Sequence, residues 1–427
     1  MNRVAVTGLG CVSPIGIGLD CAWTNLLAGK SGITDIATLG DHFHGKTRSK
    51  AIGPVPIGTD TGLFDPNHPL VSDRRYGHAV KYTLLAAHEA LQDAGWTGLT
   101  EEQGMYTGVS IGSAMGELLL IEQRGHSAIQ CDGDALSVYG PLHIIQCIPN
   151  MVPGQVSIVF GLKGPNRSTH AACATGLYSI EDGASMIRNG DARVVVTGST
   201  ESCPSLSGFC GFDAMSALSR GYSPETSSRP YDVDRNGFVY STGSGIMILE
   251  DMEHAIKRGA RIYAEYVSCG MTADAGHVSA PSGEGAVRAM RKALAKAGLS
   301  ISEIDHINAH ATSTKKGDVT EIESIREVFG SRVGQIPITA NKSVLGHMLN
   351  AASAMESVFL VKSIYEQMIP PTINLFNPDP CIAGLDIVTK ARHMNIRYGM
   401  KNAFGFGGTN ASAIFAAPNL NVMHFKG

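Results

Sequence analysis

Among the cysteines and histidines of this 427-residue sequence, three combine a reactive side chain with a position in a short run of small or polar residues. They are Cys173, His310 and His347. A thiol beside imidazoles can act as a nucleophile, because a neighbouring base activates it, and this pattern suits acyl transfer. The same residue types can bind zinc, but zinc ligands usually come in short paired spacings, which are missing here. A single histidine is more often a surface or hydrogen-bonded core residue, so function depends on whether the three turns meet.

The sequence around Cys173 predicts a sharp turn that opens a helix. A polar run at 164–167 leads into small residues around the cysteine, and a helical pattern over 177–187 ends at Asn189 and Gly190, a common helix stop. At a helix N-terminus, unpaired backbone N–H groups and the helix dipole favour the thiolate, so we expect a lowered pKa for Cys173. The alternative is a buried structural cysteine, the commoner environment for this residue type.

His310 and His347 also lie where the pattern predicts turns. A short strand over 305–310 runs into a polar loop, and the turn at His347 precedes a small-residue helix that extends to Tyr365. In open α/β layers, the loops at one end of a sheet converge on a crevice. We therefore expect the three turns to approach one another.

The order of predicted elements restarts near the middle of the chain. The helix over 85–95 resembles the helix over 287–298, and the Cys173 turn with its helix resembles the His347 turn with its helix. Repetition of strand and helix patterns predicts an α/β protein with two pseudo-symmetric, duplicated halves that share one core. The predicted halves are residues 1–253, which carry the cysteine, and residues 254–427, which carry both histidines.

Composition excludes several classes of protein. The chain is 43% hydrophobic and 17% charged with a formal net charge of −4, which gives no sign of a nucleic acid or a membrane surface as its main partner. Its nine cysteines lack CxxC spacing, so neither a disulfide framework nor a zinc ribbon is indicated. Gly8 and Gly10 follow a strand, but the third glycine falls too late, at Gly16, and Pro14 intervenes, so we reject a dinucleotide-binding loop.

The N-terminus reads directly as a strand, without a signal-peptide core, and no apolar run could span a bilayer, so we expect a cytoplasmic or organelle-stromal protein.

Four short motifs carry a more specific resemblance. They are Ala171–Thr175 (AACAT), Asn308–Thr314 (NAHATST), Lys342–His347 (KSVLGH) and Gly405–Asn410 (GFGGTN). In this order they resemble the motifs of the β-ketoacyl-acyl carrier protein synthases, which are condensing enzymes of the thiolase superfamily. The sequence is closest to the bacterial synthase I/II group, and the resemblance extends along essentially the whole chain.

The resemblance implies a thiolase-like fold with α-β-α-β-α layers, and a reaction. That reaction is the decarboxylative Claisen condensation of malonyl-acyl carrier protein with a cysteine-bound acyl chain, which gives 3-oxoacyl-acyl carrier protein in fatty acid elongation. Cys173 would hold the acyl chain, and His310 and His347 would donate N–H groups to the enolate oxygen that forms as CO₂ leaves. The backbone N–H groups of Cys173 and Phe406 would stabilise the oxyanion on the acyl group. The resemblance implies neither a cofactor nor a metal, an acyl carrier protein as partner, and a homodimer or a heterodimer with a chain-length subunit.

The resemblance also assigns supporting residues. Lys342 would form a structural ion pair with Glu321 near the histidines. Gly405 and Gly407 would let the backbone of Phe406 approach the substrate and let its ring move as a gate. The residues expected along the substrate tunnel and its support include Met115, Thr312 and Thr314.

The sequence departs from the family pattern within the expected site. Ala311 replaces the usual glycine after the first histidine, which predicts a tighter loop. Met115 lies where the family lines its acyl tunnel, and its bulky thioether predicts a shorter tunnel. Both departures bear on substrate shape rather than on the chemistry.

The region expected to meet the acidic carrier protein is short of positive charge. Residues 65–69 and 131–134 contain aspartates where family members carry basic residues, which leaves Arg74, Arg75 and Arg124 as candidate contacts. A ketosynthase of a specialised type II polyketide or polyene pathway, paired with a chain-length subunit, is therefore an alternative.

Two other readings on the same fold are less favoured. A thiolase would carry a second catalytic cysteine in the C-terminal glycine motif, and 405–410 has none. A non-catalytic chain-length partner would lack the nucleophile, whereas Cys173, His310 and His347 are all present.

Overall fold

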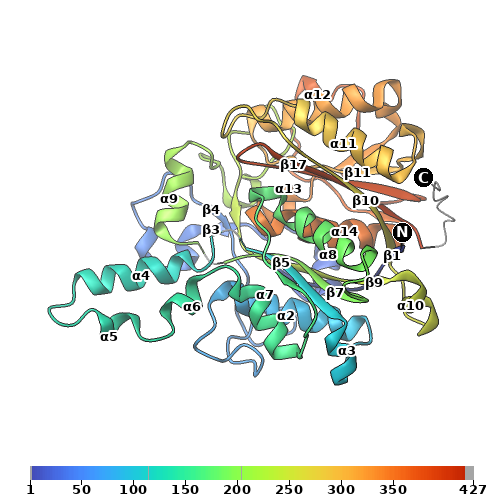
Figure 1. Ribbon diagram of the computed structural model, residues 1–427. Helices are drawn as coiled ribbons and strands as arrows, with labels where there is room; N and C mark the ends of the chain where they lie inside the picture. Colours follow the sequence, from blue (N-terminus) through green and yellow to red (C-terminus); the bar gives the residue numbers. More distant parts are fainter. Residues whose placement is uncertain (1, 114, 203, 419–427) are drawn as a thin grey trace.

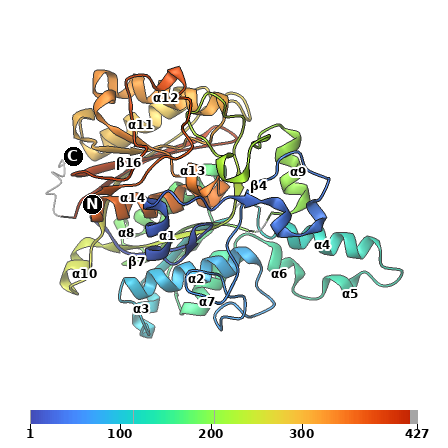
Figure 2. The ribbon, with the colours of Figure 1, turned by 180° about the vertical axis from the view of Figure 1, so that it is seen from behind.

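A computed structural model describes residues 2–113, 115–202 and 204–418. Within these residues, one mixed sheet of twelve strands has the order β14-β12-β11-β16-β17-β10-β1-β9-β7-β5-β6, with β2 paired to β1. Figures 1 and 2 show that the sheet folds around a middle layer of helices. One part of the sheet therefore lies on each side of α8 and α14.

The two parts of the sheet have the same topology. β1 (Val4–Ser13) and β10 (Ala264–Ala273) pair antiparallel where the parts join. In the first part β1–β9 and β9–β7 are antiparallel pairs, and β7–β5 and β5–β6 are parallel pairs. In the second part β10–β17 and β17–β16 are antiparallel, and β16–β11 and β11–β12 are parallel. The prediction of two pseudo-symmetric, duplicated halves is confirmed. The other strands are β2 (Gly16–Ile17), β3 (Thr34–Asp35), β4 (Ala51–Gly53), β5 (Thr107–Gly112), β6 (Asn166–Arg167), β7 (Val194–Glu201), β8 (Tyr240–Ser241), β9 (Gly243–Asp251), β11 (His306–Asn308), β12 (Pro337–Thr339), β13 (Met368–Ile369), β14 (Asp386–Ile387), β15 (Arg392–His393), β16 (Tyr398–Gly405) and β17 (Thr409–Ala416).

Helices form the other three layers. α2 (His78–Asp93) and α7 (Met151–Phe160) cover the outer face of the first part of the sheet, and α11 (Glu284–Ala297) and α12 (Lys315–Phe329) cover that of the second. α8 (Thr175–Arg188) and α14 (Ala352–Glu366) contact strands of both parts, which completes the α-β-α-β-α arrangement. The remaining helices are α1 (Leu19–Leu27), α3 (Glu101–Met105), α4 (Leu118–Ile129), α5 (Leu136–Tyr139), α6 (His143–Cys147), α9 (Leu206–Ala214), α10 (Met252–Lys257) and α13 (Lys342–Leu345).

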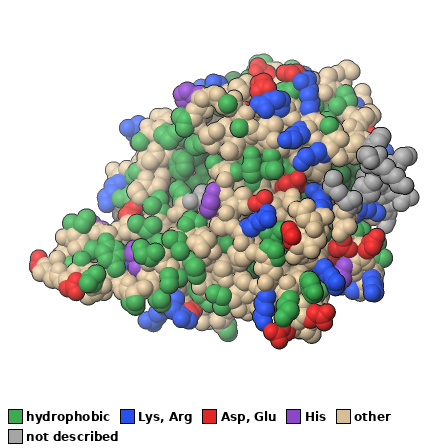
Figure 3. Space-filling model, viewed as in Figure 1, with side chains coloured by type: hydrophobic (Ala, Val, Ile, Leu, Met, Phe, Trp, Pro, Cys, Tyr) green, Lys and Arg blue, Asp and Glu red, His purple; other side chains and the backbone are tan. Residues whose placement is uncertain are grey.

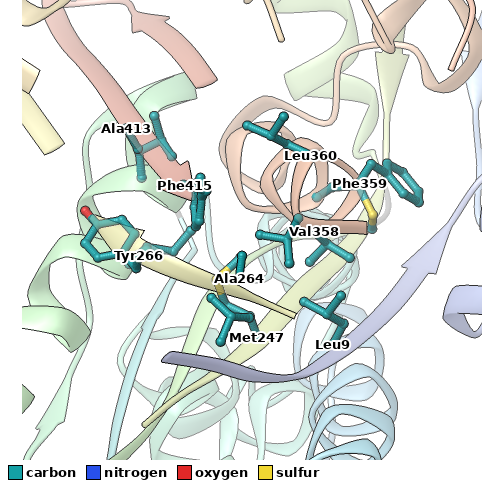
Figure 4. Close-up of a cluster of buried hydrophobic side chains, with 14 of the residues drawn as sticks. Leu9, Met247, Ala264, Tyr266, Val358, Phe359, Leu360, Ala413 and Phe415 are labelled. Atoms are coloured by element: carbon teal, nitrogen blue, oxygen red, sulfur yellow. The ribbon is translucent and has the colours of Figure 1, made fainter. Parts of the chain in front are cut away.

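The middle layer explains why α14 is rich in small residues and lacks a polar face. Thirteen of its residues are buried, because strands cover it from both sides. α8 crosses α14 so closely that a Cβ on Gly176 would overlap the backbone of Ala354. Figure 4 shows Phe359 and its neighbours on α14 packed against side chains of β1, β9, β10 and β17. Truncating a buried phenylalanine to alanine typically costs about 3–5 kcal/mol, so this cluster contributes much of the stability that holds the halves together.

The segment after β5 differs from the rest of the chain. α4, α5 and α6 project from the body as an arm, here residues 118–147, and neither α4 nor α5 has a buried residue. The sequence of the arm is rich in apolar residues, among them Leu118, Leu119 and Leu120. No helix in the described part of the chain is both long and apolar enough to cross a membrane.

Candidate active site

One cavity of about 520 Å³ gathers residues from both halves of the molecule. Cys173 enters it from the first half, and His310 and His347 enter it from the second. Most of the other lining side chains are apolar, so the cavity suits a largely hydrophobic substrate. They include Met115, Phe212, Met215, Phe238, Val278, Leu349 and Phe404. The structure therefore brings together the three side chains that the sequence singled out.

Cys173 lies in a strained turn just before α8. The 3₁₀ turn Ala172–Ala174 leads directly into the helix, and Ala172 has a φ of 46°, in the left-handed region. The Oγ1 atom of Thr175 accepts the N–H of Ala171 at 2.8 Å and donates to the carbonyl of Ala172 at 2.7 Å. The hydroxyl of Thr409, on β17, donates to the carbonyl of Ala171 at 2.8 Å. These bonds fix the position of the sulfur relative to the second half.

Burial decides the protonation of the thiol. It raises the pKa of Cys173 to about 12, although Lys342 and hydrogen bonds from the backbone N–H groups of Cys173 and Phe406 act in the opposite direction. The expected lowering of the pKa by a helix N-terminus is therefore wrong, because desolvation of the thiolate has the larger effect. The resting group is a thiol, and its proton needs an acceptor.

An imidazole nitrogen lies next to the sulfur. The Nε2 atom of His347 lies 3.1 Å from the Sγ atom of Cys173. The ring of His310 stands nearly perpendicular to that of His347, with centroids 5.5 Å apart. Burial, with the positive charge of Lys342, lowers the pKa of both imidazoles well below the usual value, so both are neutral at physiological pH.

Glu321 shapes the turn that carries His310. Its two carboxylate oxygens accept the backbone N–H groups of His310 at 2.8 Å and Ala311 at 2.7 Å. Ala311 has a φ of 28° and Ser313 a φ of 68°, so the chain bends sharply at a position where a side chain is costly. Glu321 therefore supports the site through the backbone.

The predicted ion pair between Lys342 and Glu321 is wrong. The Nζ atom of Lys342 instead lies 2.7 and 2.8 Å from the carboxylate oxygens of Glu356, on α14. Lys401, on β16, contacts the same carboxylate at 2.7 Å. Sequence reasoning missed Glu356 and Lys401, although a charged residue inside an otherwise apolar helix or strand is a usable signal, because burying a charge is costly without a partner.

Phe406 follows β16 at the mouth of the cavity, with 41% of its surface exposed. A Cβ on Gly405 would approach the carbonyl oxygen of Ala171 to 2.8 Å, and Gly407 has a φ of 81°. The two glycines thus allow the loop to lie against the Cys173 turn. The backbone N–H of Phe406 points at the sulfur, whereas motion of its ring stays a prediction.

The three residues assigned to the tunnel all line the cavity. Met115 and Phe212 both pack against the hydrophobic cluster of α9 and β8. The hydroxyl oxygens of Thr312 and Thr314 lie 3.0 Å apart, and both residues line the cavity together with His310. The catalytic and tunnel roles of all these residues stay predictions at this point.

Two of the three arginines considered as carrier contacts, Arg75 and Arg124, have partners within the chain, and the third, Arg74, is exposed. Arg75 forms an exposed ion pair with Asp73 at 2.5 Å. Arg124 donates to the carbonyl of Tyr139 at 2.9 Å, inside the arm. Neither is an unpaired cation available to an acidic surface.

The layered fold, with a thiol and two imidazoles in one cavity, defines an acyl-transferring condensing enzyme of the thiolase-like class. The family models for the N-terminal and C-terminal domains of beta-ketoacyl synthase match residues 1–255 and 263–376. The chain belongs to the β-ketoacyl synthase family.

Similar proteins cover nearly the whole chain. The chain is 42% identical to 3-oxoacyl-[acyl-carrier-protein] synthase 2 of Vibrio cholerae, over 97% of this chain and 99% of the relative. It is 41% identical to the mitochondrial 3-oxoacyl-[acyl-carrier-protein] synthase of Arabidopsis thaliana, over 97% of this chain and 93% of the relative. Among solved structures, a type II PKS ketosynthase in complex with its acyl carrier protein, bound to the hexaketide, matches with a TM-score of 0.88 and 30% identity, over 98% of this chain and 100% of that one.

Proposed function

We propose that this protein condenses malonyl-acyl carrier protein, with loss of CO₂, with an acyl chain held on Cys173, and releases 3-oxoacyl-acyl carrier protein. The observation that carries the proposal is the 3.1 Å approach of His347 Nε2 to Cys173 Sγ, with the ring of His310 facing the same cavity. Fatty acid elongation is the pathway, in keeping with the names of the relatives from Vibrio cholerae and Arabidopsis thaliana.

The first half-reaction transfers the acyl chain to the enzyme. The thiol proton of Cys173 passes to Nε2 of His347, the sulfur attacks the thioester carbonyl, and the proton then goes to the departing carrier thiolate. The backbone N–H groups of Cys173 and Phe406, which both reach the sulfur, stabilise the oxyanion of the tetrahedral intermediate. The neutral state of His347 is the state that accepts a proton.

The second half-reaction makes the carbon nucleophile. The thioester oxygen of malonyl-carrier protein lies between His310 and His347, which each donate an N–H as the C–CO₂ bond breaks and the enolate forms. For this step His347 carries its proton on Nε2, whereas the first half-reaction uses the tautomer that carries it on Nδ1. The enolate carbon attacks the acyl-sulfur carbonyl, the carbon–sulfur bond to Cys173 breaks, and the departing thiolate takes a proton from water to regenerate the thiol. Neutral imidazoles suit this step because they stabilise a developing oxyanion without giving up a proton early. Glu321 holds the His310 turn, and Lys342 acts from behind the imidazoles as a positioning group.

Mass spectrometry after incubation with acyl- and malonyl-carrier proteins tests the proposal. We expect an acyl adduct on Cys173 and a 3-oxoacyl product longer by two carbons, with neither in Cys173→Ala. Carrier proteins that support a known synthase but give no adduct and no product here would remove the proposal.

We propose that Met115 limits acyl-chain length. Its side chain lines the cavity and packs against the cluster of α9 and β8, so Met115→Gly would extend the cavity toward that cluster. We expect the variant to accept chains longer by two or more carbons, measured by competition between acyl-carrier proteins. Unchanged chain selection would contradict this role.

A polyketide or polyene ketosynthase is the second candidate, because the expected carrier-facing segments are acidic and because a type II PKS ketosynthase is among the similar structures. Product analysis separates the two pathways. A single condensation supports fatty acid elongation, whereas repeated condensation without reduction supports the alternative.

We propose that two copies of this chain associate through the arm. Its apolar side chains are unusually exposed, with Ile129 at 87% and Ile144 at 66%, and they gather on the face shown in Figure 3. Contiguous exposed apolar surface of this kind marks interaction sites. We expect the purified protein to have the mass of a dimer and Ile129→Glu with Ile144→Glu to have that of a monomer, while Ile57→Glu, at an exposed position outside the arm, stays dimeric. A wild-type monomer at micromolar concentration would exclude self-association.

The proposed condensation also assigns a separate catalytic group to each half of the chain. Residues 1–253 supply the nucleophile and residues 254–427 supply both imidazoles. We further propose a cytoplasmic or organelle-stromal location, which a fluorescent fusion in the source cell would test.

A further inference from the structure

Lys401 is a fully buried lysine behind the two imidazoles. It lies on β16 with no exposed surface. Its ammonium group lies 2.7 Å from Glu356 Oε2, 3.0 Å from the carbonyl oxygen of Ala309 and 3.5 Å from that of Asn308. An ammonium has three N–H donors, so these acceptors use all of them.

The partners of Lys401 belong to both histidine turns. Ala309 immediately precedes His310, so the ammonium holds the backbone that leads into the first turn. Glu356 also binds Lys342, which begins the short helix α13 just before the turn at His347. A single side chain therefore links the two turns from behind.

The charge of Lys401 also acts on the imidazoles. Burial has the largest effect in lowering the pKa of both His310 and His347, and the charges of Lys342 and then Lys401 lower it further. Burial lowers the pKa of Lys401 itself to about 8, with Lys342 acting in the same direction, while the carboxylates of Glu356 and Glu321 raise it. The charged groups that face Lys401 are thus on α12, α13 and α14, and both carboxylates favour its protonated form.

Stability alone does not account for a charge at this place. Replacing buried ionic groups by apolar side chains of similar volume is often neutral or stabilising. The arrangement of partners instead connects the charge to the two groups that would bind the enolate oxygen.

We propose that Lys401 is a positioning residue for the condensation: its ammonium fixes the His310 turn and the Lys342–Glu356 pair in the arrangement that presents two neutral imidazoles to the substrate. This inference rests on the proposed function. Lys401 touches neither the cavity nor the reacting atoms, so its effect passes through His310 and His347.

The test compares Lys401→Met with Lys362→Met, a matched variant at another buried lysine, whose ammonium contacts Glu366 on α14 away from the cavity. We expect Lys401→Met to lower kcat for malonyl decarboxylation and condensation at least 30-fold with KM changed less than threefold, on the scale set by loss of an electrostatic catalytic contact. Alkylation of Cys173 by iodoacetamide should change less than threefold. Lys362→Met should retain wild-type kcat.

Chemical rescue supplies a readout that a merely structural role would not move. The smaller variant Lys401→Ala leaves space between the Glu356 carboxylate and two carbonyl oxygens, and methylammonium can refill it. We expect millimolar methylammonium chloride to raise the decarboxylation rate of Lys401→Ala at least tenfold. Tetramethylammonium, which has no N–H donor, should leave that rate unchanged. Lys401→Gln replaces Lys401→Met if the latter does not fold.

Wild-type decarboxylation in Lys401→Met, an equal loss in Lys362→Met, or equal effects of both amines would each overturn the proposal. A function-independent measurement separates its failure from failure of the proposed reaction. In isotope-labelled histidine spectra, we expect the pKa of both imidazoles to rise in Lys401→Met, because a positive charge that lowers it is removed. Unmoved imidazole pKa values would overturn the role of Lys401 even if the wild-type enzyme condenses malonyl-carrier protein, and shifted values would support it even if another substrate is used.

Discussion

Glu356→Gln removes the one carboxylate that lies between two buried ammonium groups. The side chain of Glu356 is only 2% exposed, and its oxygens lie 2.7 Å from Lys342 and 2.7 Å from Lys401. Breaking a buried ion pair from one side typically costs about 3–5 kcal/mol, because the charge that stays behind has no partner. With an unfolding entropy of about 2.1 cal/mol/K per residue over 427 residues, that loss lowers Tm by about 3–6 °C.

Calorimetry of Glu356→Gln and of Glu366→Gln measures this effect. Glu366 is a matched control on the same helix, because it pairs with Lys362 at 2.8 Å but is 42% exposed, and such pairs contribute about 0–1 kcal/mol. We expect the control to shift Tm by less than about 1 °C.

The stability difference between Glu356→Gln and wild type depends on pH through the protonation of Lys401. The pKa of Lys401 is about 8 in the folded protein and 10.5 in the unfolded chain, so the unfolded state binds more protons between these values and stability rises with pH there. Loss of Glu356 lowers the folded pKa further, because Glu356 is a group that raises it. The deficit of Glu356→Gln relative to wild type should therefore be largest at the low pH where Lys401 is protonated in both folded proteins, shrink as the pH rises to 8, and stay constant from pH 8 to pH 10. Equal shifts in the two variants, or a deficit that grows with pH, would refute the reasoning.

Three further predictions concern other parts of the structure. Gly176→Val would place a side chain in the backbone of Ala354, so we expect the free energy of unfolding to fall by more than about 3 kcal/mol, seen as loss of soluble protein. The control Gly125→Ala, which has no atom near its Cβ, should leave Tm within about 1 °C of wild type. Burial raises the pKa of Glu201 to about 8, so the wild-type protein loses stability as the pH rises from 4.5 to 8. In thermal scans, Glu201→Gln should have the same Tm as wild type at pH 4.5 and a higher Tm at pH 8.5. A Tm advantage that does not depend on pH would contradict this prediction. Gly405→Ala would press the loop of Phe406 against the carbonyl of Ala171, so we expect at least a tenfold fall in the rate of acyl transfer to Cys173 with little change in Tm, and an unchanged rate would contradict the close approach.

The three reactive turns and the duplicated fold could be predicted from the sequence because both leave local marks. Cys173, His310 and His347 stand among small and polar residues, and the paired helices α2 and α11 have similar patterns of alanine and charge. Short-range periodicity carries this information directly.

What the sequence could not supply depends on approach in space. The partner of Lys342 is Glu356 and not Glu321, because α14 lies between the two parts of the sheet and places that carboxylate beside α13 and β16. The protonation of Cys173 depends on how completely the second half covers it, and a helix N-terminus in the sequence carries no measure of that cover. The arm could not be predicted because its apolar residues face outward, so they have no periodic relation to the core.

The position of β16 and β17 within the sheet bears on how the chain folds during its synthesis. β16 and β17 follow the other strands of this sheet in the described chain, yet they lie in its interior, between β11 and β10. A nascent chain that has already exposed Cys173 still lacks His310, His347 and the Phe406 loop, and its growing sheet ends at an unpaired β10. The sheet and the cavity are therefore complete only once β16, β17 and the Phe406 loop have been added, so a chain that ends before β16 carries the thiol without the full cavity.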